Sequence, residues 1–380
     1  NGLKASGVRP GDRVTLYSAN CWEWAVSYHA IAKTGAVINP INVMLTSDEV
    51  KYVVEDSGTT AVLGSADKAE SLLDLKGNNE LKEVVLFGDT VPTGAISFEE
   101  WLKSGTDTYE VAHRNREDLA AICYTSGTTG HPKGAMHSHR NIVANAQGTA
   151  MMHVRTESDV MVNSLPLPHV YGSVVFNSGF MYGAKLVIVP RFEEEVVMSA
   201  IQQHRATILD GVPTAYYFLL AHPKFDDYDL STLTRSTVGG QTLPAAKSIE
   251  WEERVGTAVL ELWGMTELAG AATANPYYGD NKPGTIGLAY PGSEGKIVSA
   301  EDPTLDLEIG DEGEFMFRGP LVMLGYYGND EATRDAMASG GWMHTGDIAT
   351  QDEDGYFTIV DRKKDMILTA GYNVYPAELE

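Results

Sequence analysis

The chain of 380 residues is long enough for two or three packed subdomains, each with its own core. Its 52 acidic residues outnumber 28 basic ones, and this net charge of −24 argues against nucleic acid and anionic membrane surfaces as partners. No segment approaches the roughly 18 uninterrupted apolar residues that a membrane-spanning helix needs. The two cysteines, Cys21 and Cys123, match no metal-ligand spacing, and such sparing use of cysteine favours the cytoplasm.

Strand-like and helix-like segments alternate from the N-terminus to about Pro283. The first strand is predicted at Val14–Ser18 and the first helix at Cys21–Lys33, and the capping-box pattern Thr46-x-x-Glu49 predicts the start of another helix. Further strands are predicted at Thr60–Leu63, Val84–Phe87, Leu119–Tyr124, Leu186–Val189, Thr207–Leu209 and Ala258–Leu262, with helices at Asn141–Met151 and Pro213–Ala221. This alternation is typical of an α/β fold in which helices cover parallel sheets.

The pattern changes after about residue 283. Short strands such as Gly295–Val298 and Glu314–Arg318 are separated by turn residues, and Asp354-Gly355 predicts a tight hairpin. We therefore expect a small antiparallel β-barrel subdomain over residues 284–361. Both ends of the chain interrupt a predicted element, so we expect a domain over residues 1–361 that is N-terminally incomplete.

The most informative segment is the loop Tyr124–Ala135, which follows a predicted apolar strand and precedes a predicted helix. Glycines there let backbone N–H groups converge on phosphate oxygens, hydroxyls add donors, and Lys133 supplies a mobile positive charge. It is not a Walker A loop, because Pro132 occupies the position five residues after Gly127, where that motif requires glycine. The residues expected to contact phosphate are Thr125, Ser126, Gly127, Thr128 and Thr129.

This loop resembles the signature of the adenylate-forming superfamily, which includes acyl- and aryl-CoA synthetases, luciferases and peptide-synthetase adenylation domains. Further segments resemble the family's motifs in the family's order, so that the resemblance covers essentially the whole chain. They are Gly239–Pro244, Leu262–Glu267, Trp342–Asp347 and Asp361-Arg362. The resemblance implies that residues 1–361 form the family's large N-terminal adenylation domain.

The resemblance also assigns roles in holding ATP or AMP. It makes Glu267 the Mg²⁺ ligand and Thr266 a phosphate contact, and it makes Trp263 the aromatic residue that stacks on adenine. Tryptophan replaces the family's usual tyrosine here, and Asp361 stands where glycine is common. The remaining nucleotide-binding residues that it implies are Gly240, Gln241, Gly264 and Met265 around the base, and Asp347 and Arg362 at the ribose.

For the acyl group, the resemblance makes His169 the gate of the substrate channel. Val170 follows it, where amino-acid-activating relatives have aspartate, and this argues against an amino-acid substrate. The run Ala269–Ala272 is unusually small and predicts a roomy pocket, for an aryl or hydroxycinnamic acid or for a medium-to-long fatty acid. The segments expected to line it are His169–Ser173, Asp210–Val212, Gly239–Gln241 and Met265–Ala272. His137 and His139 are interpreted as a loop residue and a helix-start residue.

The final segment, Arg362–Asp365, resembles the family's hinge, with Lys364 at the pivot. Residues 362–380 are thus expected to be the hinge and the start of a small C-terminal domain that is otherwise missing. The predicted activity is an ATP-dependent carboxylate–CoA ligase that uses ATP, Mg²⁺ and CoA, with His169, Lys133, Thr266 and Glu267 as its catalytic residues. A homodimer is the assembly that we expect. The alternatives are an acyl-AMP ligase that delivers to a carrier protein and a non-catalytic nucleotide-binding module.

Overall fold

The computed structural model describes residues 1–76, 80–103, 105–125, 131–363, 367–369 and 372–374. Its largest sheet has eight strands in the order β17-β7-β6-β2-β1-β3-β4-β5. Neighbouring strands from β2 to β5 and the β2–β6 pair run parallel, whereas β7 and β17 are antiparallel to their neighbours. The bounds are β1 Arg13–Tyr17, β2 Val37–Pro40, β3 Thr59–Ser65, β4 Glu83–Phe87, β5 Ile96–Ser97, β6 Leu119–Thr125, β7 Lys133–Ser138 and β17 Gly325–Tyr326.

A second sheet has seven strands in the order β14-β13-β12-β11-β10-β8-β9. The strands from β8 to β12 pair in parallel, and β13 and β14 extend the sheet in antiparallel fashion. The bounds are β8 Val160–Asn163, β9 Lys185–Ile188, β10 Ile208–Gly211, β11 Arg235–Val238, β12 Val259–Met265, β13 Gly270–Ala274 and β14 Leu288–Ala289. The α/β class predicted from the alternating segments is confirmed.

Helices cover both sheets. Thr46 caps α3 through the capping box that the sequence predicted. The bounds are α1 Gly2–Ala5, α2 Trp22–Thr34, α3 Ser47–Asp56, α4 Ala69–Asp74, α5 Phe98–Lys103, α6 His139–His153, α7 Val170–Tyr182, α8 Glu194–His204, α9 Pro213–Ala221, α10 Ala245–Val255 and α11 Asp330–Ala336. None of these helices is both long and apolar enough to cross a membrane.

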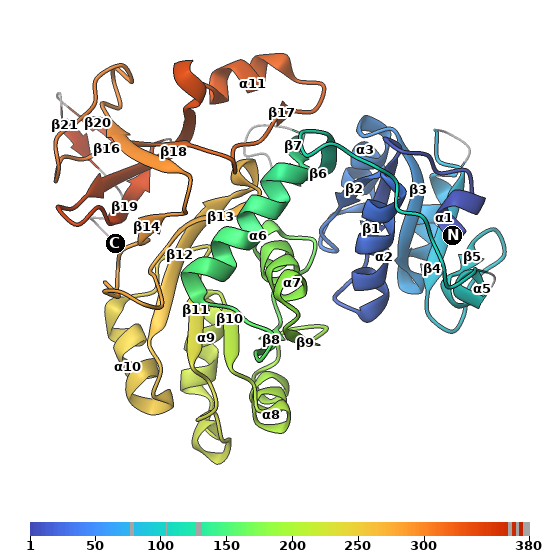
Figure 1. Cartoon of the computed structure of the whole chain (residues 1–380), viewed down its shortest axis with the longest axis horizontal. Helices are drawn as coiled ribbons and strands as arrows, with labels where there is room; N and C mark the ends of the chain where they lie inside the picture. The colour runs from blue at the N-terminus through green and yellow to red at the C-terminus, as the bar shows by residue number, and fades with distance from the viewer. Residues whose placement is uncertain (77–79, 104, 126–130, 364–366, 370–371, 375–380) are drawn as a thin grey trace.

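Helices α6 and α7 lie between the two large sheets (Figure 1). Helix α7 is apolar on nearly every side, as expected for a helix that is enclosed rather than set on a surface. Phe176 of α7 packs edge-on against Trp24 and Tyr28 of α2, so the helix joins the cores of both halves. Helices α6 and α7 thereby connect the sheet that carries Lys133 to the second sheet.

Four strands of the region after residue 283 form an antiparallel sheet of their own, β15-β16-β18-β19, whereas β14 and β17 of the same region join the two large sheets. The antiparallel pattern predicted from the sequence is present, including the hairpin at Asp354-Gly355 between the last two strands. The bounds are β15 Glu294–Val298, β16 Gly313–Arg318, β18 Met343–Gln351 and β19 Phe357–Arg362, followed by a two-stranded pair of β20 Ile367–Thr369 and β21 Tyr372–Val374.

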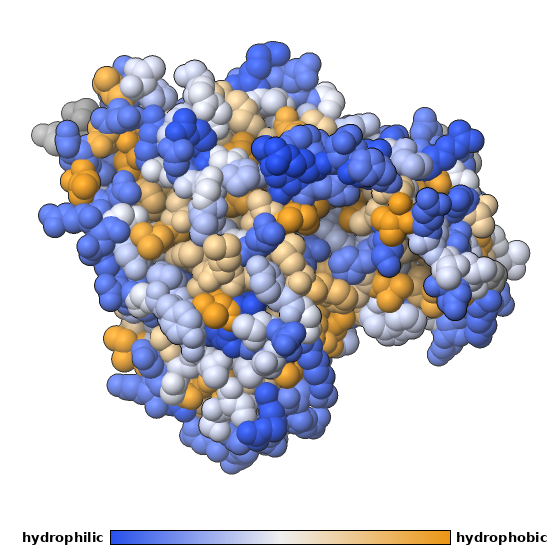
Figure 2. Space-filling model, in the orientation of Figure 1, coloured by the Kyte–Doolittle hydropathy of each residue, from blue (hydrophilic) through white to orange (hydrophobic). Residues whose placement is uncertain are grey.

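The surface agrees with the acidic composition. Figure 2 shows hydrophilic residues over most of the outer rim of the visible face, with strongly apolar residues in small separate spots. Such scattered apolar residues are ordinary on soluble proteins and need no partner to explain them.

Candidate active site

The predicted strand–loop–helix arrangement around Lys133 is wrong. Lys133 begins β7, which returns antiparallel to β6 and pairs Lys133 with Thr125. Gly134 permits this close return, since a Cβ there would lie 2.6 Å from a methyl group of Ile122. Helix α6 begins only at His139, because Ser138 caps it. Ser126, Gly127, Thr128 and Thr129, which were expected to bind phosphate, lie outside the described residues.

Lys133 and Glu267 are brought together by a tyrosine that the sequence did not reveal. The Lys133 ammonium lies 4.3 Å from the centre of the Tyr326 ring, and the Tyr326 hydroxyl donates a hydrogen bond of 2.6 Å to Oε1 of Glu267. Strand β17 positions Tyr326 by pairing with β7. Lys133 and Glu267, which are far apart in sequence, therefore flank one phenol ring.

Glu267 has the chemistry of a Mg²⁺ ligand in a nucleotide site. Its second oxygen, Oε2, makes no hydrogen bond to any described residue. Among all the residues that the structure describes, no group of three His, Cys, Asp or Glu side chains is arranged to hold a metal ion. Protein sites for Mg²⁺ in nucleotide enzymes commonly supply only one or two carboxylates and leave other positions to phosphate and water. A single carboxylate beside a lysine fits that arrangement.

The backbone of Thr266 is held by His137, which the sequence predicts to lie in a loop. His137 lies in β7 instead, is 2% exposed, and places Nε2 2.7 Å from the carbonyl oxygen of Thr266. Burial lowers the pKa of His137 to about 4, so its ring is neutral near pH 7. Since a carbonyl only accepts hydrogen bonds, Nε2 carries the proton and donates it.

Trp263 links the adenine-side motif to the ribose-side motif. Its indole Nε1 donates a hydrogen bond of 2.8 Å to Oδ2 of Asp347, and its ring packs against Phe315 with centroids 5.0 Å apart. The residues predicted to bind base and ribose thus contact each other directly, although they are separated by more than eighty positions in the chain. Adenine stacking on Trp263 stays a prediction.

Asp347 and Arg362 face each other across the β18–β19 pair. Their backbones are direct partners, and Nε of Arg362 lies 3.7 Å from Oδ1 of Asp347. Burial raises the pKa of Asp347 above its ordinary value, while the Trp263 hydrogen bond and Arg362 oppose that shift. Oδ2 of Asp347 is held by Trp263, whereas Oδ1 has only the long ion pair with Arg362 and is suited to accept hydrogen bonds from sugar hydroxyls.

The residue after β19, Lys363, is anchored by contacts that no sequence motif indicates. Lys363 donates a hydrogen bond of 2.8 Å to Glu314, whose side chain is 3% exposed, and its backbone N–H donates to Gly346. The following residue, Lys364, which was predicted as the pivot, lies outside the described residues. No sequence spacing connects Glu314 to Lys363, since their proximity depends on the order of the strands.

The glycine-rich turn Gly239–Pro244 directly follows strand β11 of the second sheet. Val238 of β11 pairs with Glu261 of β12, and a Cβ on the following Gly239 would lie 2.5 Å from Leu262 of β12. Gly240 has φ of +91°, which favours glycine, and both it and Gln241 are exposed. Position 264 requires glycine, because a Cβ there would lie 2.0 Å from the carbonyl oxygen of Gly270. Met265 ends β12, immediately before Thr266.

His169 caps the helix that separates the two sheets. Its Nδ1 accepts a hydrogen bond of 3.2 Å from the backbone N–H of Tyr171, and its ring is exposed. The surrounding protein lowers the pKa of His169. His169 is thus accessible to solvent at the start of α7, and its role as a gate stays a prediction.

The run Ala269–Ala272 packs closely, and the roomy pocket that it predicts stays a prediction. These residues are buried, and a Cβ on Gly270 would lie 3.1 Å from Val174 and 3.3 Å from Asn145. Their small size allows β13 to pack closely against α6 and α7. Asp210, expected to line the same pocket, is also fully buried and forms an ion pair with Arg155.

Comparison with known proteins places this site in a family. A family model described as "AMP-binding enzyme" matches residues 1–327. The chain is 31% identical to a long-chain-fatty-acid–CoA ligase of Bacillus subtilis, over all of this chain and 72% of that protein. It is 34% identical to a feruloyl-CoA synthase of an Amycolatopsis species, over all of this chain and 74% of the relative.

A solved structure supports the same placement. The anthranilate CoA ligase AuaEII, solved in complex with anthranoyl-AMP, superimposes with a TM-score of 0.93 at 31% identity, over all of this chain and 74% of that one. The chain belongs to the AMP-binding enzyme family, and its fold is that of the large domain of adenylate-forming enzymes. The superfamily predicted from the sequence motifs is therefore confirmed.

Proposed function

We propose that this protein is an AMP-forming acid–CoA ligase, which converts a carboxylic acid to its acyl-adenylate with ATP and then to its acyl-CoA. One observation carries the proposal: Lys133 and Glu267 both contact Tyr326, and Trp263, four residues before Glu267, donates a hydrogen bond to Asp347. The names of the relatives, which ligate fatty and aryl acids to CoA, support the same activity.

In the first half-reaction, the substrate carboxylate attacks the α-phosphorus of ATP and pyrophosphate leaves. Catalysis then depends on orientation and on compensating the negative charge of the phosphates. Lys133 would neutralise phosphate oxygens, and Thr266 would donate its hydroxyl to one of them. Mg²⁺, when bound, supplies further positive charge at the leaving group, and Glu267 is the residue that would hold it.

Trp263, Asp347 and Arg362 would hold the nucleoside. The indole presents an aromatic face to adenine, with Gly240, Gln241, Gly264 and Met265 beside it. Asp347 accepts hydrogen bonds from ribose hydroxyls, and Arg362 balances its charge. The hydrogen bond from Trp263 to Asp347 orients the carboxylate before the nucleotide binds.

In the second half-reaction, the thiol of CoA attacks the acyl carbonyl and AMP leaves. We propose that residues 1–361 are the adenylation domain and that residues 362–380 are the hinge, with Lys364 as its pivot, and the start of the small domain. The anchor at Glu314 supports this boundary, because it fixes Lys363 to the large domain immediately before the pivot.

The acyl group is an aryl or hydroxycinnamic acid, or a medium-to-long fatty acid, which enters past His169. The enclosed cavity behind Ala269 and Val170 measures about 10 Å³, which is room for one water molecule and excludes it as the acyl site. We further propose a cytoplasmic location, supported by two unpaired cysteines, and a homodimer, which light scattering would test.

The test is ATP–pyrophosphate exchange and AMP release by the full-length protein with 4-coumaric, ferulic, decanoic and palmitic acids. Exchange that depends on one of these acids, with AMP release that depends on CoA, supports the proposal. Exchange without any effect of CoA would indicate transfer to a carrier protein instead. Nucleotide binding without exchange would indicate a non-catalytic module.

A further inference from the structure

The turn that carries Glu267 is held by hydrogen bonds at every carbonyl from residue 266 to 268. Thr266 accepts from His137 and from the backbone of Ala269, Glu267 accepts from the backbone of Met323, and Leu268 accepts from Asn145. The backbone of this turn is therefore fixed from outside by three different segments.

The turn needs this support because its backbone is strained. Ala269 has φ of +57°, a left-handed conformation that is unfavourable for a non-glycine residue. Such a conformation persists only where the surrounding structure imposes it. The external hydrogen bonds supply that constraint.

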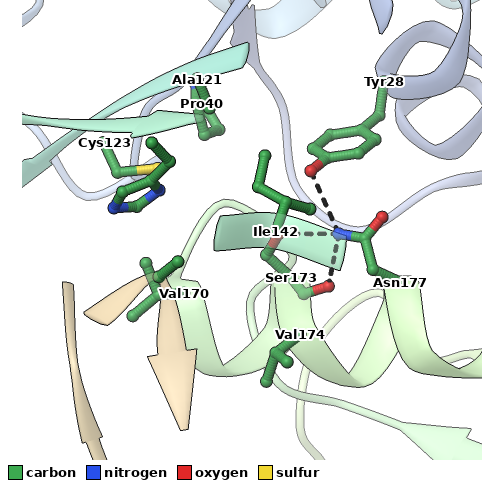
Figure 3. Close-up of a pocket in the computed structure, with 11 residues that line it drawn as sticks. Tyr28, Pro40, Ala121, Cys123, Ile142, Val170, Ser173, Val174 and Asn177 are labelled. Carbon is green, nitrogen blue, oxygen red and sulfur yellow. Dashed lines mark hydrogen bonds between the residues drawn. The ribbon is translucent and has the colours of Figure 1, made fainter. Parts of the chain in front are cut away.

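Packing beneath the turn is incomplete, so its position depends more on the hydrogen bonds than on side-chain packing. The 10 Å³ cavity lies behind Ala269 and is also lined by His137, Cys123 and Val170. Figure 3 shows the cavity between the first sheet and α7, with Tyr28, Ser173 and Asn177 joined by hydrogen bonds at the opposite end. Residues that line a void lose the contacts that would otherwise restrict their movement.

Two of the side chains that hold the turn, His137 and Asn145, come from β7 and α6, which follow each other directly in the chain. His137 of β7 bonds Thr266, and Asn145 of α6 donates to both Leu268 and Ala271 at 2.8 Å. Both side chains are 1–2% exposed. The same strand begins with Lys133, so these contacts fix the distance between the lysine and the turn of Glu267.

We propose that His137 is a positioning residue, which sets Thr266 and Glu267 against Lys133 through its hydrogen bond to the Thr266 carbonyl. This inference rests on the proposed ligase function. His137 does not contact substrate. It acts by fixing the backbone on which the phosphate and metal ligands stand, and a misplacement of about 1 Å there is enough to slow a reaction roughly 100-fold.

The experiment compares three variants of the full-length protein. In His137→Gln, the amide nitrogen reaches the Thr266 carbonyl; in His137→Asn, the side chain is one methylene shorter and does not reach it. Asn177→Leu is the matched control, since it removes hydrogen bonds at the opposite end of the same cavity. For each protein, thermal unfolding is measured together with kcat and KM for ATP in pyrophosphate exchange, over a range of Mg²⁺ concentrations.

We expect His137→Asn to lower kcat/KM for ATP about 10- to 100-fold and to raise the Mg²⁺ concentration needed for half-maximal rate. His137→Gln should stay within about 3-fold of the unchanged protein, and Asn177→Leu should lose thermal stability without this kinetic change. The inference is overturned if His137→Asn keeps its kinetics, or if His137→Gln loses activity to the same degree. Failure of the proposed function looks different, because the unchanged protein then shows no acid-dependent exchange.

Discussion

The two sides of the nucleotide site are built differently. On the side of Glu267, the backbone is fixed by buried donors, and Tyr326 holds the carboxylate at 2.6 Å. On the side of Arg362, the ion pair to Asp347 spans 3.7 Å, and the arginine side chain is 62% exposed. Buried residues thus hold the Glu267 side in position, whereas the Arg362 side lies at the exposed end of β19, next to the proposed hinge.

This difference separates two tasks. Phosphate and metal ligands must be in place before the reaction, because moving charged groups during the reaction costs free energy. Nucleoside contacts contribute mainly to binding, and they have to be released when AMP leaves. We therefore expect substitutions on the Glu267 side to affect kcat and substitutions on the Arg362 side to affect KM.

The largest effect is expected from Lys133→Ala. Removing the positive charge that Lys133 places above Tyr326 should lower kcat about 100- to 1,000-fold, as with loss of other groups that stabilise transition-state charge. Pyrophosphate exchange measures this, with Lys51→Ala on α3 as the control. Undiminished turnover would contradict the catalytic role of Lys133.

A smaller loss, about 100-fold in kcat, is expected from Glu267→Gln, because an amide binds Mg²⁺ more weakly than a carboxylate does. The rate should recover partly as Mg²⁺ is raised. Tyr326→Phe keeps the ring beside Lys133 and removes only the hydroxyl, so it should cost less than Glu267→Gln. An unchanged Mg²⁺ dependence in Glu267→Gln would exclude Glu267 as the metal ligand.

Asp347→Asn should raise KM for ATP roughly 10-fold while leaving kcat within a few-fold, since charge-assisted hydrogen bonds to ribose are lost. Burial raises the pKa of Asp347, so its ionised form is disfavoured by folding. The variant should therefore unfold at the same or a slightly higher temperature near pH 7.

The same shift predicts a pH dependence for the unchanged protein. A carboxyl whose pKa is raised by folding takes up its proton at a higher pH than an ordinary Asp does, so KM for ATP should begin to rise before the pH falls to 3.8. In Asp347→Asn this rise should disappear. A rise of equal size in both proteins would assign it to another group.

Arg362→Ala is expected to have the smallest effect. A long, solvent-exposed ion pair contributes about 0–1 kcal/mol, so the thermal stability should not change and KM for ATP should rise only a few-fold. A loss of kcat as large as that of Glu267→Gln would show that the two sides are not distinct.

The bounds of the predicted helices and strands agree with the structure better than the predicted arrangement of side chains does. Helix Pro213–Ala221 was predicted with the bounds that the structure shows, and most strands were correct within two residues, because local periodicity determines them. The segment after Lys133 was misassigned because β7 has no alternating pattern: Gly134 and Ala135 are both buried, as are His137 and Ser138.

Residues that act through tertiary contacts left no signal in the sequence. Tyr326 reaches Glu267 only because β17 adds to the edge of the first sheet, and His137 reaches Thr266 only because the two sheets enclose α6 and α7. The small residues Ala269–Ala272 show the same limit. A run of alanine and glycine predicts close packing and open space equally well, and only the neighbouring helices decide between them.

The central claim is that the contacts around Lys133, Glu267 and Asp347 make one site for forming acyl-adenylates. It is tested most directly by ATP–pyrophosphate exchange in the full-length protein, with and without a carboxylic acid, for the unchanged protein and for Lys133→Ala. We expect exchange that requires the acid and is lost in the variant. Exchange that is independent of the acid, or equal in the two proteins, would contradict this account.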